Sequence, residues 1–304
     1  MIINDPWREN FGSKETSSAV SDKGVAFLQR RAQQNAAPAT IPTTTTTTTA
    51  SAPTSRPTAR PEAQPFFVWL HYFDVHERHD LRSSPFLKDI PAGRPAYRAM
   101  LHHVDAQIGR VLDTLEKGPD AAHTIVVFTA DHGEGLSDAP RLPRFHGNVL
   151  YEELVRVPLI IRLPKALGIS PATKVATRRQ QVVSLTDIVP TLLDLVGVPS
   201  PKVSGLSLAP FVLTSRAVPY AIERPLALYE EKQRGLIVWP WKLLLWKRRG
   251  LVELYRLDID PKEAHNLVDQ ETPRVKAMIR RLALHRIPEI NRRAKASASA
   301  SGDK

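Results

Sequence analysis

Apolar and polar positions follow a clear helical period in the first half of this 304-residue chain. From residue 95 to 117 apolar side chains recur every three or four positions, which predicts the strongest helix of the chain. Pro95 suits its first turn, and Gly118 with the following proline ends it. The apolar positions are Tyr97, Met100, Leu101, Val104, Ile108, Val111, Leu112 and Leu115.

Short continuous apolar runs predict strands on both sides of this helix. One run covers residues 66–70, another covers 124–129, and a third covers 157–163. The run at 124–129 is short, uninterrupted and bounded by turn residues, so it predicts a buried strand. The order strand, helix, strand from 66 to 129 predicts a βαβ unit and a parallel sheet with helices on its faces.

The second half changes pattern after Phe211. A helix is predicted over 185–196, capped by Ser184 or Thr186 and ended by Gly197. Four short apolar runs between residues 226 and 255, separated by turn residues, predict a small antiparallel sheet. A basic helix is predicted from Thr272 to about residue 290, and a weaker helix is predicted over 15–34.

Composition divides the chain into five predicted regions. Residues 36–65 are almost entirely Ala, Pro, Ser and Thr, and they include seven consecutive threonines. Such a segment buries too little apolar area to offset its ordering entropy, so a disordered insert is expected. The predicted regions are a partial N-terminal helix region (1–35), the insert (36–65), an α/β domain (66–215), a small C-terminal sheet subdomain (216–270), and a basic helix with a tail (271–304).

Cysteine usage and charge exclude some classes of function. The chain has no cysteine, which excludes disulfides, thiolate zinc sites and a cysteine nucleophile. No apolar run is long enough to span a bilayer, and the N-terminus shows no signal pattern. The net charge of +11 is concentrated at the ends and in residues 242–249. A solvated surface is favoured over nucleic-acid binding, and the last helix is expected to pack its apolar face on the domain rather than lie on anionic lipid.

Asp131 and His132 follow the 124–129 strand directly, at the kind of sheet edge where α/β proteins place ligands. Adjacent strand residues point to opposite faces, so both can reach one ion only if the backbone turns, and Gly133 and Gly135 permit a turn. A carboxylate with an imidazole suits a divalent cation. The alternative is an Asp and a His that cap the loop.

Further histidines follow the predicted strands at 66–70 and 124–129. His146 comes after a loop long enough to fold back over the strand end, and His71 and His76 follow the 66–70 strand. Several histidines near a metal could stabilise an oxyanion, although a lone histidine, His71 above all, is more often a plain hydrogen-bonding residue. The Ser-containing string at residues 51–56 is rejected as a nucleophile loop because low-complexity sequence produces such strings by chance.

Several segments in order resemble the sulfatase family of the alkaline-phosphatase superfamily, over roughly residues 65–270. They are PFFVWLHYFDVH, TIVVFTADHGEGL, FHGNVLYEELVRVPLIIRLP, VVSLTDIVPTLLDLVGV, GLSL and ELYRLDIDPKEAHNL. The resemblance implies an α/β fold, in which helices sandwich a mixed sheet of the alkaline-phosphatase type and a small antiparallel sheet follows at the C-terminus. It also implies cleavage of sulfate esters, carried by a small molecule or a glycan, at a metal-assisted site.

The resemblance assigns a role to four residues. Asp131 matches a metal-ligand aspartate. His132 takes the neighbouring ligand position, which is Asn in many arylsulfatases and His in related phosphate- and phosphonate-ester hydrolases. His76 resembles the histidine that contacts the sulfate group, and His146 resembles a second basic group beside it. With Asn the usual ion is calcium, whereas a His ligand leaves magnesium, manganese or zinc open as well.

The chain departs from the family pattern in one important respect. Active members carry paired aspartates and a C/S-x-P-S/A-R segment whose first residue matures to the formylglycine nucleophile, and neither is found here. We therefore expect the C-terminal portion of a sulfatase, completed by an N-terminal partner segment. The alternatives are a non-catalytic sulfatase-like binding module and a phosphate- or phosphonate-ester hydrolase. The resemblance suggests a periplasmic, extracellular or membrane-attached parent, although these residues show no targeting pattern.

Overall fold

The computed structural model describes residues 2–3, 16–36, 64–76, 87–136, 146–167, 178–179, 181–213 and 224–285. They belong to two compact units, Met1–Val126 with Leu163–Gly168, and Val127–Arg162 with Ile169–Lys304. The predicted insert lies almost entirely outside the described residues, and the predicted tail lies outside them altogether.

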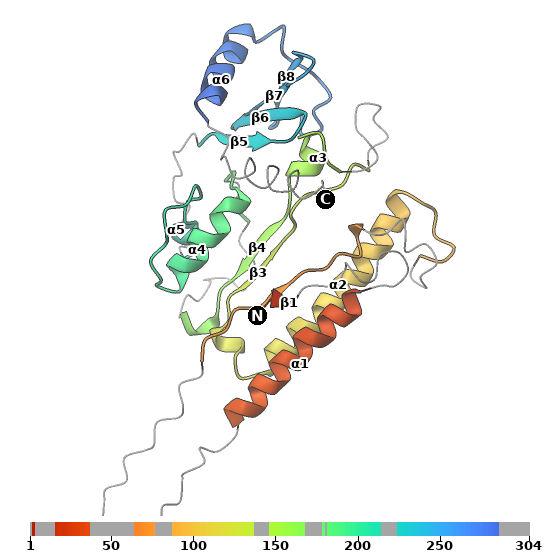
Figure 1. Cartoon of the computed structure of the whole chain (residues 1–304), viewed down its shortest axis with the longest axis vertical. Coiled ribbons are helices and arrows are strands. Elements are labelled where there is room, and N and C mark those ends of the chain that lie inside the picture. Colours follow the sequence, from red (N-terminus) through yellow and green to blue (C-terminus); the bar gives the residue numbers. More distant parts are fainter. Residues whose placement is uncertain are drawn as a thin grey trace, which may run out of the picture. The chain divides into compact units, whose positions relative to one another are not determined.

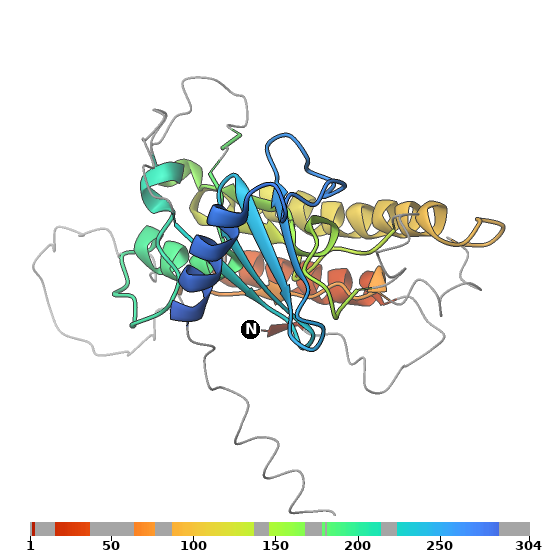
Figure 2. The same ribbon diagram turned by 90° about the horizontal axis from the view of Figure 1, so that it is seen from above.

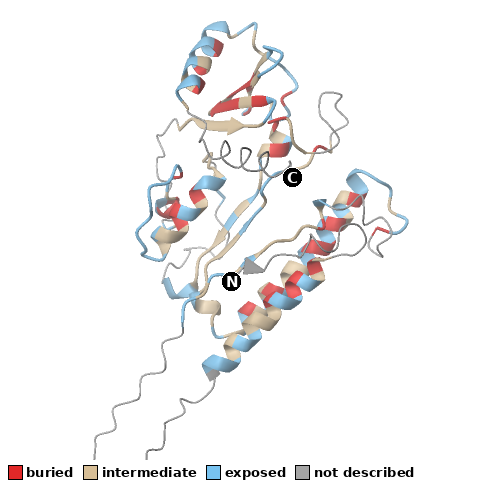
Figure 3. Cartoon of the chain, in the orientation of Figure 1, coloured by how far each residue is buried: buried red, intermediate tan, exposed pale blue. Residues whose placement is uncertain are grey.

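The first unit is built on two helices that lie side by side (Figures 1 and 2). Its elements are β1 (Ile2–Ile3), α1 (Ser17–Ala36), β2 (Trp69–Leu70), α2 (Arg94–Lys117), η2 (Ala121–His123) and η3 (Lys165–Leu167). The predicted helical period of α2 is confirmed, because its apolar positions Met100, Val104, Val111 and Leu115 are buried (Figure 3). Gly118 caps its end, with its amide bonded to the Leu115 carbonyl.

The second unit contains a two-stranded sheet, short helices and a four-stranded sheet. Its elements are β3 (Val126–Thr129), α3 (Glu152–Val155), β4 (Leu159–Arg162), η4 (Leu185–Asp187), α4 (Ile188–Leu195), α5 (Ala209–Val212), β5 (Leu226–Tyr229), β6 (Gln233–Val238), β7 (Trp241–Trp246), β8 (Val252–Arg256) and α6 (Thr272–Leu284). The predicted helix over 185–196 is confirmed, with Ser184 capping η4 and Gly197 at a φ of 71° after α4.

Two predictions about the strands need correction. β2 pairs with β1 and β3 pairs with β4, so the direct pairing expected of a βαβ unit is not found among the described residues. β3 is also not a buried strand, because Phe128 is 41% exposed. An uninterrupted apolar run predicts cover on both faces, and the pairing seen in the described residues leaves part of β3 open.

The four antiparallel strands β5–β6–β7–β8 form the small C-terminal sheet that the sequence predicts. Successive residues face opposite sides of a strand, so the sheet has two distinct faces. Leu236, Leu243 and Leu254 pack with Val275, Met278 and Leu282 of α6, which lies along that face (Figure 2). Leu244, Tyr255 and Leu257, on the other face, pack with residues 149–154. The expected packing of the α6 apolar face on the domain is confirmed.

The described helices were also tested for membrane-spanning length. Across the described ranges, no helix combines the length and the apolar character that crossing a membrane requires.

Candidate functional site

The candidate site forms where the chain leaves β3. The backbone bends at Asp131, and the amide of His132 donates to Asp131 Oδ1 at 2.9 Å. The bend ends the strand alternation that would send neighbouring side chains to opposite faces. Asp131 Oδ2 consequently lies 3.7 Å from His132 Nε2.

The His132 ring is oriented by its own loop. Its Nδ1 lies 2.8 Å from the carbonyl oxygen of Gly133. A carbonyl oxygen can only accept, so Nδ1 carries the proton of the neutral ring and donates it. The Nε2 lone pair is thereby left for a ligand, on the side where the Asp131 carboxylate lies. Metal-ligating histidines typically donate their other ring N–H to a backbone carbonyl in this way.

The pair Asp131 and His132 fits a divalent cation in donor type and in spacing. Two ligands each about 2.1 Å from one ion lie roughly 3.0–3.5 Å apart at octahedral to tetrahedral angles, close to the observed separation. Both side chains reach solvent, with exposed fractions of 77% for Asp131 and 41% for His132. Among the described residues no group of three or more His, Asp or Glu side chains suits a metal, so this chain presents a pair of ligands there.

His146 joins the site from the segment that follows. Its ring stacks on the ring of His132, with the centroids 4.4 Å apart and the planes inclined by 25°. Its Nδ1 lies 3.4 Å from Glu134 Oε2. The structure therefore brings together three of the four residues that the resemblance singled out.

Glu134 is the residue that the sequence reasoning missed. Its side chain is only 6% exposed although it lies in a polar loop. A buried carboxylate beside an imidazole restricts the orientation of the ring. The available signal was the spacing, since Glu134 lies two residues after His132 in the same glycine-bounded turn.

Gly133 is needed for a close approach. A Cβ at this position would lie 2.0 Å from the Glu153 carbonyl oxygen, and the Gly133 amide donates to the Leu154 carbonyl at 2.8 Å. Among the described glycines with positive φ, neither Gly133 nor Gly135 is found. The backbone turn that the glycines were expected to permit is centred on Asp131, and Gly133 lets the loop rest on α3.

His76 belongs to the first unit, whereas the other three residues belong to the second. Its exposed ring stacks on Phe73, with the centroids 4.4 Å apart, and its amide donates to the Phe73 carbonyl at 2.9 Å. The preceding Asp74 is buried and accepts the amides of Thr16 and Ser17 at the start of α1. A helix start and the loop after β2 thus fix the backbone that carries His76. His71 lies edge-on to Phe73.

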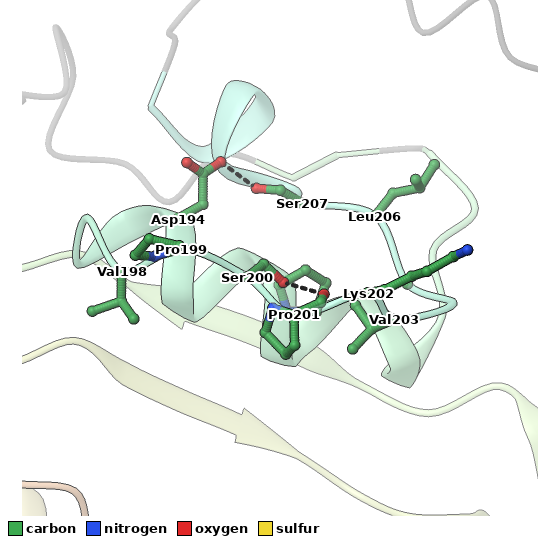
Figure 4. Close-up of a pocket in the computed structure, with 11 residues that line it drawn as sticks. Asp194, Val198, Pro199, Ser200, Pro201, Lys202, Val203, Leu206 and Ser207 are labelled. Atoms are coloured by element: carbon green, nitrogen blue, oxygen red, sulfur yellow. Dashed lines mark hydrogen bonds between the residues drawn. The ribbon is translucent and has the colours of Figure 1, made fainter.

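An open pocket lies along α4 and the loop that follows it (Figure 4). Its walls are mainly proline and valine, with Asp194 turned toward Ser207, whose hydroxyl donates to it at 2.6 Å. None of the four predicted site residues lines it.

Two family models match the chain. The model described as Sulfatase matches residues 6–198, and the model described as N-sulphoglucosamine sulphohydrolase, C-terminal, matches residues 144–287. The two models together include every segment on which the resemblance rests. The Sulfatase model alone covers more than half of the chain. The matching fold is also found in solved sulfatase structures, which confirms the predicted fold class.

Individual relatives match only part of their own length. An arylsulfatase of Clostridium perfringens is 32% identical over 187 residues, which are 60% of this chain and 37% of the relative. An N-acetylglucosamine-6-O-sulfatase of Bacteroides thetaiotaomicron is 31% identical over 182 residues, which are 56% of this chain and 31% of the relative. A solved structure in complex with its substrate D-glucosamine-2-N,6-O-disulfate is 28% identical, with a TM-score of 0.50, over 62% of this chain and 39% of that one. The chain spans about a third of the length of the curated relatives it matches.

Proposed function

Because this chain belongs to the sulfatase family, we propose that it supplies the metal-binding and sulfate-contacting part of a site for sulfuric ester hydrolysis. Asp131 and His132 are the proposed metal ligands, and His146 and His76 are the proposed sulfate contacts. The substrate is a sulfated small molecule or glycan, a class that includes the sulfated glucosamine named for two similar proteins.

One observation carries this proposal. The Nε2 of His132, freed by the bond from Nδ1 to Gly133, lies 3.7 Å from Asp131 Oδ2, and the His146 ring stacks directly on His132. Two cation ligands and an anion-binding ring therefore adjoin one another at a strand end. An isolated capping Asp and His would not require the second histidine.

The proposed roles follow from the chemistry of each side chain. A bound divalent cation, calcium by family habit or magnesium, manganese or zinc given the imidazole, would act as a Lewis acid on the ester oxygens. His146 carries a ring that can donate to a sulfate oxygen and whose orientation Glu134 supports at 3.4 Å. The family resemblance assigns His76 the role of a further sulfate donor.

The attacking group is the missing part of this scheme. Ester hydrolysis requires an oxygen nucleophile held in line with the leaving group. The 304 residues contain neither the paired aspartates nor the C/S-x-P-S/A-R segment that the family uses. We therefore propose that turnover requires a polypeptide segment that carries these residues.

A hydrolysis assay tests this scheme. The full chain is incubated with an aryl sulfate and each divalent metal, alone and together with a polypeptide that carries the paired aspartates and a matured formylglycine. We expect little turnover alone and metal-dependent turnover in the complemented sample, which Asp131→Asn abolishes. Robust turnover by the chain alone would show that the chain contains its own nucleophile, which would contradict the proposal.

Phosphate- or phosphonate-ester hydrolysis is the second candidate, and His132 favours it. The related phosphate- and phosphonate-ester hydrolases resemble this chain in having His where many arylsulfatases have Asn. Rates on aryl phosphate and aryl sulfate, measured in the same complemented sample, separate the two. A faster sulfate reaction supports the first proposal, and a faster phosphate reaction supports this one.

A non-catalytic binding module is the third candidate, since the site residues present could bind an anion without cleaving it. It predicts that inorganic sulfate binds with the involvement of His146 and that no complementing polypeptide restores turnover.

A further inference from the structure

The inner face of the C-terminal sheet carries polar side chains where an apolar core would be expected. Gln233 of β6 and Lys242 of β7 are both fully buried, and Glu253 of β8 lies on the same face. This face packs against residues 149–154. Three neighbouring strands thus each direct one polar group toward a single segment, and buried polar groups are costly unless they are bonded.

That segment, residues 148–152, is bonded through three backbone amides. The Asn148 amide donates to Glu230 Oε1 at 3.2 Å and the Leu150 amide donates to Gln233 Oε1 at 2.7 Å. The Glu152 amide, at the start of α3, donates to Glu263 Oε2 at 2.7 Å. The segment is not part of a strand. Side chains of the sheet and its loops therefore supply the acceptors that its amides would otherwise lack.

Two side-chain contacts hold the same segment. The Lys242 ammonium lies 2.8 Å from Glu152 Oε1 and 2.9 Å from Glu263 Oε1. The Tyr151 hydroxyl donates to Glu253 Oε2 at 2.9 Å. Residues 148, 150, 151 and 152 each bond to a different side chain of the sheet or its following loop. This combination fixes the position of the segment, because a shift of one residue would separate each bonded group from its partner.

We propose that this polar row, Glu230, Gln233, Lys242, Glu253 and Glu263, sets the position of His146 over His132. His146 lies two residues before Asn148, the first residue of the segment whose amide is bonded. The other end of the segment leads into α3, whose Leu154 carbonyl accepts the Gly133 amide at 2.8 Å. Both loops of the candidate site are thus located by the same clamped segment. The row members are positioning residues, and their link to sulfate binding rests on the proposed function.

An apolar face would hold the sheet in place with less desolvation cost than this row does. Replacing buried polar groups by apolar ones of similar volume is often neutral or stabilising. Apolar contacts alone, however, are non-directional and leave a segment free to pack in a shifted position. The polar row is therefore accounted for by the placement of the segment rather than by stability alone.

The test variant is Gln233→Met, which keeps the size of the side chain and removes the acceptor for the Leu150 amide. Its control is Leu236→Val, on the opposite face of the same strand against α6. The readout is the set of histidine ring signals in the NMR spectrum of the labelled full chain, in which stacked rings shift each other upfield. His132→Asn and His146→Asn assign the two rings among the ten histidines.

We expect the wild type and Leu236→Val to show the upfield shifts of His132 and His146, and Gln233→Met to lose them. Gln233→Glu, which retains an acceptor oxygen for the Leu150 amide, should keep the upfield shifts. If Gln233→Met does not fold, Tyr151→Phe removes the contact with Glu253 more gently and should reduce the same shifts. Unchanged shifts in a folded Gln233→Met or Tyr151→Phe would overturn the proposal.

Titration with inorganic sulfate separates this inference from the proposed function. We expect Gln233→Met to weaken sulfate binding about fivefold, the equivalent of one neutral hydrogen bond of about 1 kcal/mol. If the wild type binds no sulfate but Gln233→Met still loses the ring shifts, the positioning stands and the sulfate role of His146 fails. If sulfate binds equally well to both proteins and the ring shifts persist, the positioning fails alone.

Discussion

His132 is held by the loop that contains it. The bond from Nδ1 to the Gly133 carbonyl selects the tautomer, and the bond from its amide to Asp131 Oδ1 brings the carboxylate alongside. Both contacts arise within three consecutive residues, so the ligand pair needs little help from the rest of the fold. What the rest of the fold supplies is the position of His146.

At the residue scale, Gly133→Ala is expected to destabilise the protein by about 1–3 kcal/mol. The new methyl would meet the Glu153 carbonyl at 2.0 Å, and this contact is with backbone rather than with a movable side chain. Urea unfolding measures the change. The matched control is Gly109→Ala, in α2 with nothing within 4 Å, which should be stabilising by about 0.5–1 kcal/mol. Equal effects of the two substitutions would contradict the close approach.

The sequence predicted the proposed ligand pair but not all of its surroundings. Asp131 and His132 were proposed because they follow an apolar run and precede glycine, which are local signals. Glu134 was missed because its burial depends on how residues 146–154 return to the loop. The close approach of Gly133 to the Glu153 carbonyl could not be predicted for the same reason.

At the element scale, the four-stranded sheet combines apolar packing on its α6 face with the polar row on its inner face. The fully buried Lys242 is paired with two carboxylates, which is the arrangement that a buried cation requires. The short apolar runs predicted the strands themselves. Gln233 and Lys242 interrupt the apolar pattern of the inner face. Their contacts could not be predicted from the sequence, because their partners lie 83 and 90 residues away in the chain.

Lys242→Met is expected to destabilise the protein by about 3–5 kcal/mol, because it leaves Glu152 and Glu263 close together without their cation. Thermal and urea unfolding measure this loss. Lys276→Met, on an exposed residue of α6, serves as the control and should change stability by less than about 0.5 kcal/mol. A folded Lys242→Met of wild-type stability would mean that the cluster does not depend on its charge.

Glu263 predicts a pH dependence. Burial raises the pKa of its carboxyl above the ordinary 4.5, against the lowering effect of Lys242 and of the Glu152 amide. The folded state therefore binds more protons than the unfolded chain over an interval above pH 4.5, and the free energy of unfolding falls as pH rises through that interval. Glu263→Gln keeps an acceptor for the Glu152 amide and removes this titration.

Urea unfolding at a series of pH values compares the wild type with Glu263→Gln. The stability of the wild type relative to the variant should be greatest at acidic pH and decline as the pH rises past the raised pKa. A difference that stayed constant, or that grew with pH, would show that burial does not raise the pKa of the Glu263 carboxyl.

At the scale of the whole molecule, the division into five regions stays a prediction. It places a disordered insert at residues 36–65, which contain Ala39 and Ala50, neither of them followed by proline. Limited digestion with elastase, which cuts after small side chains, should cut first in this segment, because exposed disordered segments are the preferred sites of proteolysis. Ala99 and Ala106 of α2 are the internal control and should resist. First cleavage within α2 would contradict the division.

The family and fold class could be read from the order of the landmark segments, whereas the strand pairing could not. The 66–70 and 124–129 runs both predict strands, but an apolar run does not specify its neighbour. Pairing depends on which segments share a sheet, and the structure pairs these runs with residues 2–3 and 159–162. For His76, the sequence predicted only that the residue follows the 66–70 run, not which residues it contacts.

The central claim is that Asp131 and His132 bind a divalent cation beside His146. Titration of the full chain with Mn²⁺, followed by electron paramagnetic resonance, tests it most directly. We expect Asp131→Asn and His132→Phe each to weaken binding about tenfold or more, whereas His102→Asn, on an exposed histidine of α2, leaves it unchanged. Wild-type Mn²⁺ binding by Asp131→Asn would contradict the assignment of the site.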